Sequence, residues 1–139
     1  MAGSVSNYAA HKILDHIVGK TSFTMPTVWV ALCTAAPTDA SIGSTLVEAT
    51  YTDYARKSTA GSDWDVAAGR VTANAAAITF VICSASSSTV SHFALVDSAT
   101  TAQGNVLAWG ALSAPLAVSA GIQPVFAIGA LDLTVTAGS

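Results

Sequence analysis

The stretch ThrValTrpValAlaLeuCysThr, at residues 27–34, decides the fold class of this 139-residue chain. It is rich in β-branched and aromatic residues, which favour strands. AlaAlaProThrAsp follows at 35–39, and such a cluster is typical of turns. A short apolar strand that ends in a turn is therefore the first unit that the sequence predicts.

Similar apolar stretches recur along the chain, and Gly, Ser, Pro and Asn separate them. We expect further strands at 54–58, 76–83, 89–97, 106–112, 116–119 and 125–135. Short strands at near-regular spacing indicate an antiparallel sandwich or barrel, not a parallel α/β sheet. The sequence thus predicts a mainly β protein, and its length fits a single domain over residues 1–139.

One amphipathic helix is predicted near the N-terminus, at about 7–18. Its apolar residues fall at i, i+3, i+4, i+7 and i+8, which places them on one helical face: Ala10, Ile13, Leu14, Ile17 and Val18. Ser4 or Ser6 is expected to cap the start, and Gly19 to end the helix in a left-handed conformation.

The segment 125–135 is predicted to form the last strand. Its second half alternates apolar with polar residues, whereas its first half is apolar on both faces. Phe126 and Ile128 therefore need a cover, which is either the N-terminal helix or another subunit. We expect the helix to provide it, and we name both residues as candidate interface positions.

Charged residues are scarce: Asp, Glu, Lys and Arg make up 9% of the chain, against 52% hydrophobic residues. An ordinary soluble domain carries about 25% charged residues. A subunit that is covered by copies of itself or by a larger assembly needs few solvating charges, because an unpaired charge is costly to bury at an interface. The composition therefore predicts a protein that works in an assembly.

The net charge of −3 and the five basic residues argue against nucleic acid as a partner. A stretch without charge runs from Asp97 to Asp132, but Gly, Pro, Ser, Asn and Gln interrupt it, so we expect no membrane span. The first residues lack the pattern of a secretory signal, so we expect synthesis in a cytoplasm.

The motifs for catalysis or metal binding are incomplete. GlyLysThr at 19–21 follows a helix instead of opening one and lacks the first glycine of a phosphate loop. His11 and His16 lie about 140° apart on a helix and cannot share a metal ion. Cys33 and Cys83 lie in apolar stretches and are expected to be buried thiols. We therefore expect no catalytic, cofactor or metal site and no enzyme activity.

Asp63 and Asp65 flank Trp64, which leaves two interpretations open. An acid pair beside an aromatic platform is typical of a sugar site. The same residues also form a surface loop whose Trp inserts into a neighbouring subunit, and Trp is enriched at such anchors. We favour the second interpretation and name Trp64 as a candidate interface residue.

Five segments, taken in order, resemble a family of small structural proteins of tailed bacteriophages, described as head-decoration or tail-fibre-like proteins. They lie at 6–19, 28–39, 74–80, 91–100 with 104–112, and 125–135, and include HisPheAlaLeuValAsp at 92–97 and GlyAlaLeu at 110–112. The resemblance covers nearly the full length. It implies a virion component with a jelly-roll-like sandwich, no enzymatic residues, and assembly as a trimer on a capsid or within a tail.

Three functions follow as hypotheses. The first is a capsid decoration (cement) protein that stabilises the head shell by packing against the major capsid protein and its own copies. The second is a tail-fibre or tail-tip module with tail proteins as partners, in which the loops around Trp64 and at 41–45 are candidates for contact with a host surface. The third is a carbohydrate-binding sandwich that uses Asp63, Trp64 and Asp65.

Overall fold

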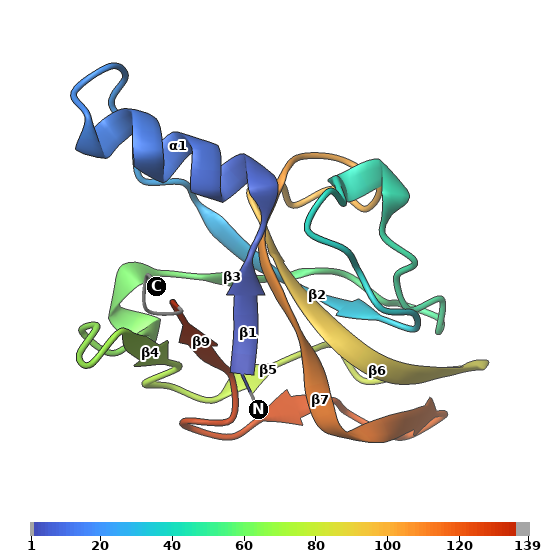
Figure 1. The fold of residues 1–139 in the computed structure, drawn as a ribbon. Helices are drawn as coiled ribbons and strands as arrows, with labels where there is room; N and C mark the ends of the chain where they lie inside the picture. Colours follow the sequence, from blue (N-terminus) through green and yellow to red (C-terminus); the bar gives the residue numbers. More distant parts are fainter. Residues whose placement is uncertain (1, 136–139) are drawn as a thin grey trace.

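The computed structural model describes residues 2–135, which form a mainly β protein with one α-helix near the N-terminus (Figure 1). The large sheet has seven strands in the order β3-β2-β6-β7-β1-β9-β4. A second, two-stranded sheet pairs β5 with β8. The prediction of a mainly β, antiparallel architecture with an N-terminal helix is confirmed; within the described residues the exception to antiparallel pairing is the parallel contact between β1 and β9.

The elements follow one another along the chain with these bounds: β1 Ala2–Val5, α1 Asn7–Ile17, β2 Val28–Cys33, the 3-10 helix η1 Gly43–Thr45, β3 Lys57–Thr59, the 3-10 helix η2 Gly61–Asp63, β4 Val71–Ala73, β5 Ile78–Thr79, β6 Ser87–Val96, β7 Val106–Ser119, β8 Val125–Phe126 and β9 Asp132–Thr134.

The main core lies between the large sheet and the β5–β8 pair. Val30 and Leu32 of β2 lie opposite Leu95 and Phe93 of β6, which places the four side chains on one face. They pack in one buried cluster with Ile78, Phe80 and Phe126 of the small sheet and its flank. The small sheet therefore covers this face as a second layer.

The opposite face of the large sheet carries a smaller core. Ala31 and Cys33 of β2 pack there against Ala94 and Val96 of β6 and Val106 of β7. The segment 27–34 is thus buried on both faces over its second half, which explains why it lacks polar alternation.

The predicted strands 106–112 and 116–119 form one continuous strand, β7. Its pairing with β6 shifts register between Val90, which lies opposite Leu116, and His92, which lies opposite Ala111. The extra residues 112–115 form a bulge that contains Pro115, a residue without an N–H to donate to the sheet. The proline marks a bulge here and not the end of a strand.

The predicted strand at 125–135 is wrong, because the chain turns in its middle. Residues 127–131 form a turn between β8 and β9, with Gly129 at φ +75°. Phe126 is only 8% exposed, and its ring meets Phe80 edge-on with the centroids 6.0 Å apart. Ile128 is 70% exposed. The expectation that the N-terminal helix covers these two residues is therefore also wrong.

The helix itself begins and ends as predicted. Ser6 caps α1 by accepting a hydrogen bond from the Ala9 N–H at 3.2 Å, and Gly19 follows the helix with φ +73°. The Ser6 hydroxyl also donates to the Val106 carbonyl, and the Ser6 N–H donates to Leu107 at 3.0 Å. These bonds anchor the start of α1 on β7.

Candidate functional site

The apolar face of α1 points away from the body of the protein. Leu14, Ile17 and Val18 are 59%, 71% and 72% exposed, and Ile13 is 39% exposed. We call these four residues the α1 stripe. Figure 1 shows that the helix crosses the top of the body and that its C-terminal end overhangs it. The stripe is therefore available to another molecule, contrary to the expectation that the helix covers its own sheet.

The body-facing side of α1 carries the contacts that hold the helix in place. Ala9 is 4% exposed, and Tyr8 packs against the main core. The Phe23 N–H donates to Nδ1 of His16 at 3.1 Å, which ties the segment after the helix back to its last turn. Tyr8 and Ile17 lie nine residues apart, or about 180° around a helix, so an inward Tyr8 leaves Ile17 outward.

Trp64, the first of the predicted interface residues, is half-buried at the edge of the main core. Its indole N–H donates to the Thr59 hydroxyl at 3.1 Å. Its ring lines a groove of about 200 Å³ together with Met25, Pro26, Val28, Thr59, Ala60 and Gly61. We call this the Trp64 groove. The Trp64 side chain packs within its own chain, and the groove lies beside it. It therefore does not project outward in the way that insertion into a neighbouring subunit requires.

The two acidic neighbours of Trp64 differ in their surroundings. A carboxylate oxygen of Asp63 accepts the Ala60 N–H at 2.8 Å and so caps the η2 turn. Asp65 is exposed, while its backbone N–H donates to Ala73 at 2.8 Å. Of the predicted acid pair, the Asp63 carboxylate is therefore hydrogen-bonded within a turn of its own chain.

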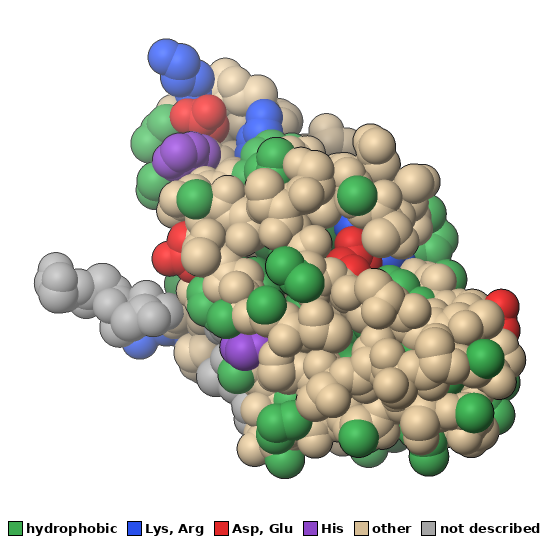
Figure 2. Space-filling model, turned by 90° about the vertical axis from the view of Figure 1, so that its right-hand side faces the viewer, with side chains coloured by type: hydrophobic (Ala, Val, Ile, Leu, Met, Phe, Trp, Pro, Cys, Tyr) green, Lys and Arg blue, Asp and Glu red, His purple; other side chains and the backbone are tan. Residues whose placement is uncertain are grey.

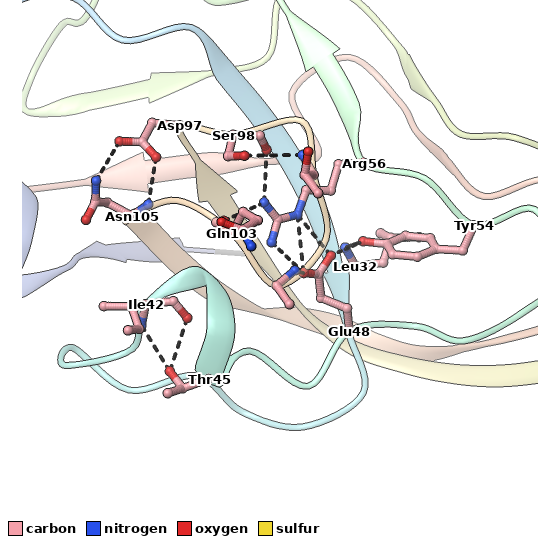
Figure 3. A network of polar contacts seen from close by, with 12 residues as sticks. Leu32, Ile42, Thr45, Glu48, Tyr54, Arg56, Asp97, Ser98, Gln103 and Asn105 are labelled. Atoms are coloured by element: carbon pink, nitrogen blue, oxygen red, sulfur yellow. Dashed lines mark hydrogen bonds and ion pairs between the residues drawn. The ribbon is translucent and has the colours of Figure 1, made fainter.

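A buried ion pair between Glu48 and Arg56, in the segment between β2 and β3, is bonded to the loop between β6 and β7 (Figure 3). The Arg56 guanidinium contacts the Glu48 carboxylate, with Nη2 2.5 Å and Nε 3.2 Å from Oε1. The second carboxylate oxygen accepts the Tyr54 hydroxyl at 2.7 Å. Arg56 Nη1 also donates to the carbonyls of Ser98 and Gln103, both at 2.9 Å. Each of the two buried charges, on Arg56 and on Glu48, is therefore paired and hydrogen-bonded, and an unpaired charge would be costly to bury here.

The same loop supports the segment 41–45, the second loop predicted to contact a partner. The Gly43 N–H donates to the Gly104 carbonyl at 2.8 Å, and Ile42 forms a bridge with Asn105. Asp97 accepts both the backbone and the side-chain N–H of Asn105, at 2.6 and 2.9 Å. The loop 97–105 and the turn η1 therefore form one hydrogen-bonded unit.

Sequence reasoning missed Glu48, Tyr54 and Arg56. A signal was present, because Glu48 is the single Glu of a charge-poor chain and lies between Val47 and Ala49. A lone charge within an apolar stretch indicates a buried partner of opposite sign. Which of the basic residues is that partner does not follow from the sequence.

The predicted cysteine environment is confirmed, since Cys33 and Cys83 are both buried free thiols. Burial, with a smaller effect from Glu48, raises the pKa of Cys33 to about 12. His92 is half-buried, next to the Trp109 ring, and its Nδ1 lies 2.8 Å from the Ser91 hydroxyl.

Among residues 2–135, no three His, Cys, Asp or Glu side chains are grouped so that they could hold a metal ion. In the same part of the chain, no helix combines the length and the apolar character that crossing a bilayer requires.

The comparison with family models identifies the class as phage virion structural proteins of the fibre type. The matching model is described as "Podophage GP4 fiber I protein gp80" and covers residues 4–134. The chain belongs to this family, and the predicted resemblance to tailed-phage structural proteins is confirmed. The comparison with curated proteins found no match.

Proposed function

We propose that this chain is a subunit of a podophage tail fibre or tail tip, and that it works by packing, without catalysis. The observation that carries the proposal is the match of residues 4–134 to a family described as a fibre protein. Of the predicted functions, the tail-fibre alternative fits that description better than capsid decoration does. Capsid decoration remains a prediction that the family description does not favour.

The surface supports a role in an assembly. Figure 2 shows a face on which Lys, Arg, Asp and Glu side chains are few and hydrophobic side chains are scattered between polar ones. Such a surface is suited to contact with other protein surfaces, because few charges lose their hydration there. We propose copies of the same chain, as a trimer, and adjoining tail proteins as the partners.

The loop unit of 41–45 and 97–105 supports a further role in contact with a tail protein or a host surface. Arg56, which is paired with Glu48, holds the loop 97–105 in place by donating to the carbonyls of Ser98 and Gln103. A loop that is ordered before binding loses less conformational entropy when it binds. The side chain of Ile42 in this unit is exposed and offers an apolar contact.

The carbohydrate hypothesis has less support. One carboxylate oxygen of Asp63 accepts the Ala60 N–H and caps the η2 turn, so this member of the acid pair already has a structural role. The polar edge of Trp64 is bonded to Thr59, and the groove beside its ring has mostly apolar residues. We therefore favour a protein contact at this place.

The proposal is tested by locating the chain on purified virions. Antibodies against the recombinant protein, detected by gold labelling in electron microscopy, are expected to mark the tail, and quantitative mass spectrometry is expected to find few copies per particle. Labelling spread over the head, with copy numbers that follow the capsid lattice, would support decoration instead. Absence of the chain from virions would contradict both.

A further inference from the structure

A second hollow, of about 420 Å³, is lined by α1, by the segment 22–27 that follows the helix, and by Asp97 at the end of β6. We call it the α1 hollow. Figure 1 shows that the chain turns back after α1 and runs beneath the helix to β2. The volume of the hollow lies within the range of small-ligand pockets, about 300 to 1,000 Å³.

Tyr8 and Phe23 give the α1 hollow an aromatic part. Both side chains are half-buried and pack against the main core. The Phe23 N–H also donates to His16, so the position of this residue is fixed from two sides. Aromatic rings that are held in this way favour a ligand with an apolar ring face.

Three hydroxyl side chains line the same hollow, those of Ser22, Thr24 and Thr27. Among residues 2–135, none of these three hydroxyl groups has a hydrogen-bond partner. A hydroxyl group both donates and accepts hydrogen bonds. The lining is therefore suited to a ligand that carries several hydroxyl groups of its own.

The α1 hollow also contains one acidic and one basic residue, whose surroundings differ. Both carboxylate oxygens of Asp97 accept hydrogen bonds from Asn105, at 2.6 and 2.9 Å. The Lys12 ammonium lies 5.6 Å from the centroid of the Tyr8 ring, and within the part of the chain that the structure describes no carboxylate pairs with it. A ligand carboxylate would supply that partner through a charge-assisted hydrogen bond.

We propose that the α1 hollow binds an acidic saccharide, and that Lys12 pairs with the carboxylate of this ligand. An inorganic anion would leave the aromatic rings of the lining unused, and a neutral sugar would leave the Lys12 ammonium without its partner. The inference rests on the contact with a host surface that we propose for the loops 41–45 and 97–105, because Asp97 belongs to both places. It names the chemical class of the ligand.

A nuclear magnetic resonance titration of the isotope-labelled full chain measures binding and locates it at the same time. The acidic probe is digalacturonic acid, and galactobiose is its neutral counterpart without carboxylates. Digalacturonic acid is expected to shift the amide signals of Lys12 and of the segment 22–27. We expect it to bind at least about 10-fold more tightly than galactobiose, because only the acidic probe pairs with Lys12.

Lys12→Gln removes the ammonium group and keeps a long polar side chain. This variant is expected to bind digalacturonic acid at least about 10-fold more weakly and to bind galactobiose as the wild-type chain does. Lys20→Gln makes the same change of charge at an exposed residue outside the hollow and is the matched control. It is expected to leave the affinity for both probes unchanged.

Thr24→Val tests the hydroxyl groups, because it replaces a hydroxyl by a methyl group of similar size at an exposed position. It is expected to weaken the binding of both probes about 3-fold, since one hydrogen bond to the ligand is lost. Thr21→Val, at an exposed position outside the lining, is its control and is expected to bind as the wild-type chain does.

Three results would overturn the inference. The first is a titration with digalacturonic acid in which no amide of the hollow shifts. The second is equal binding of this probe by Lys12→Gln and Lys20→Gln, which would show that Lys12 has no particular role. The third is inorganic phosphate binding in the hollow as tightly as the acidic probe, which would indicate a site for any anion. The location of the chain on the virion is measured independently, so a failure here is distinguishable from a failure of the fibre assignment.

Discussion

Asn74 and Leu131 are joined by two hydrogen bonds, although 57 residues separate them. The Asn74 backbone N–H donates to the Leu131 carbonyl at 3.1 Å, and the Leu131 N–H donates to Oδ1 of Asn74 at 2.8 Å. The Asn74 side-chain amide also donates to Ala76 and Ala127, each at 2.9 Å. One fully buried side chain therefore holds the turn between β8 and β9 against the strand β4.

Replacing Asn74 by Ala is expected to destabilise the protein by about 2–4 kcal/mol, because three hydrogen bonds are lost and buried backbone groups lose their partners. Urea denaturation followed by tryptophan fluorescence measures the change. Asn7→Ala, at an exposed position in the first turn of α1, is the control and should stay within about 0.5 kcal/mol. Equal stability of the two variants would contradict the role of Asn74.

The buried ion pair predicts a strongly non-additive double-mutant cycle. Glu48→Leu and Arg56→Met each leave one charge buried without its partner, and each is expected to cost about 3–5 kcal/mol of unfolding free energy. The double variant is expected to cost much less than the sum, because no unpaired charge remains. Lys57→Met, on an exposed side chain next to Arg56, serves as the control. Additive single effects would show that the two side chains act independently.

Gly43 is predicted to tolerate no side chain. A Cβ at this position would lie 1.9 Å from the Gln103 carbonyl oxygen, so Gly43→Ala must push η1 away from the loop 97–105. The expected cost is about 1–3 kcal/mol, typical of overpacking, together with faster amide exchange at Gly43. A glycine without such a neighbour, Gly61, gives the comparison: Gly61→Ala should be nearly neutral. A neutral Gly43→Ala would mean that the two loops are not held together.

Stability is predicted to fall as the pH rises from about 9 to 12. Burial raises the pKa of Cys33 from 9.0 to about 12, and burial with the nearby Glu48 raises the pKa of Tyr54. In this window the unfolded chain loses protons that the folded chain keeps, so alkali favours unfolding by up to about 1.4 kcal/mol per pH unit for each group. Cys33→Ala is expected to flatten the decline, and a decline of unchanged slope would contradict it.

The elements that the sequence predicted well are those whose signals are local. Ser6 and Gly19 mark the two ends of the helix. Their signals are local, because a capping residue and a left-handed terminator act within one helical turn. The apolar and β-branched residues of β2 and β6, and the turn residues that follow them, are likewise signals carried by neighbours in the chain. These elements needed no knowledge of tertiary contacts.

The errors arose where a distant residue decides the local structure. The stretch 125–135 reads as one strand, yet Asn74 bends it by supplying side-chain hydrogen bonds from elsewhere in the chain. The outward orientation of the α1 stripe depends on Tyr8 and Ala9 docking on the core, and an amphipathic pattern does not say which face docks. Of the predicted interface residues, Phe126 belongs to the core of its own chain, while Trp64 and Ile128 remain candidates.

A cryo-EM reconstruction of the intact virion tests the central claim most directly, because this fold is recognisable by its long β6–β7 pair and its overhanging helix. We predict density for the chain in fibres attached to the tail, with several copies around each fibre axis. Density for the same fold at regular positions on the head lattice, with none on the tail, would contradict the account.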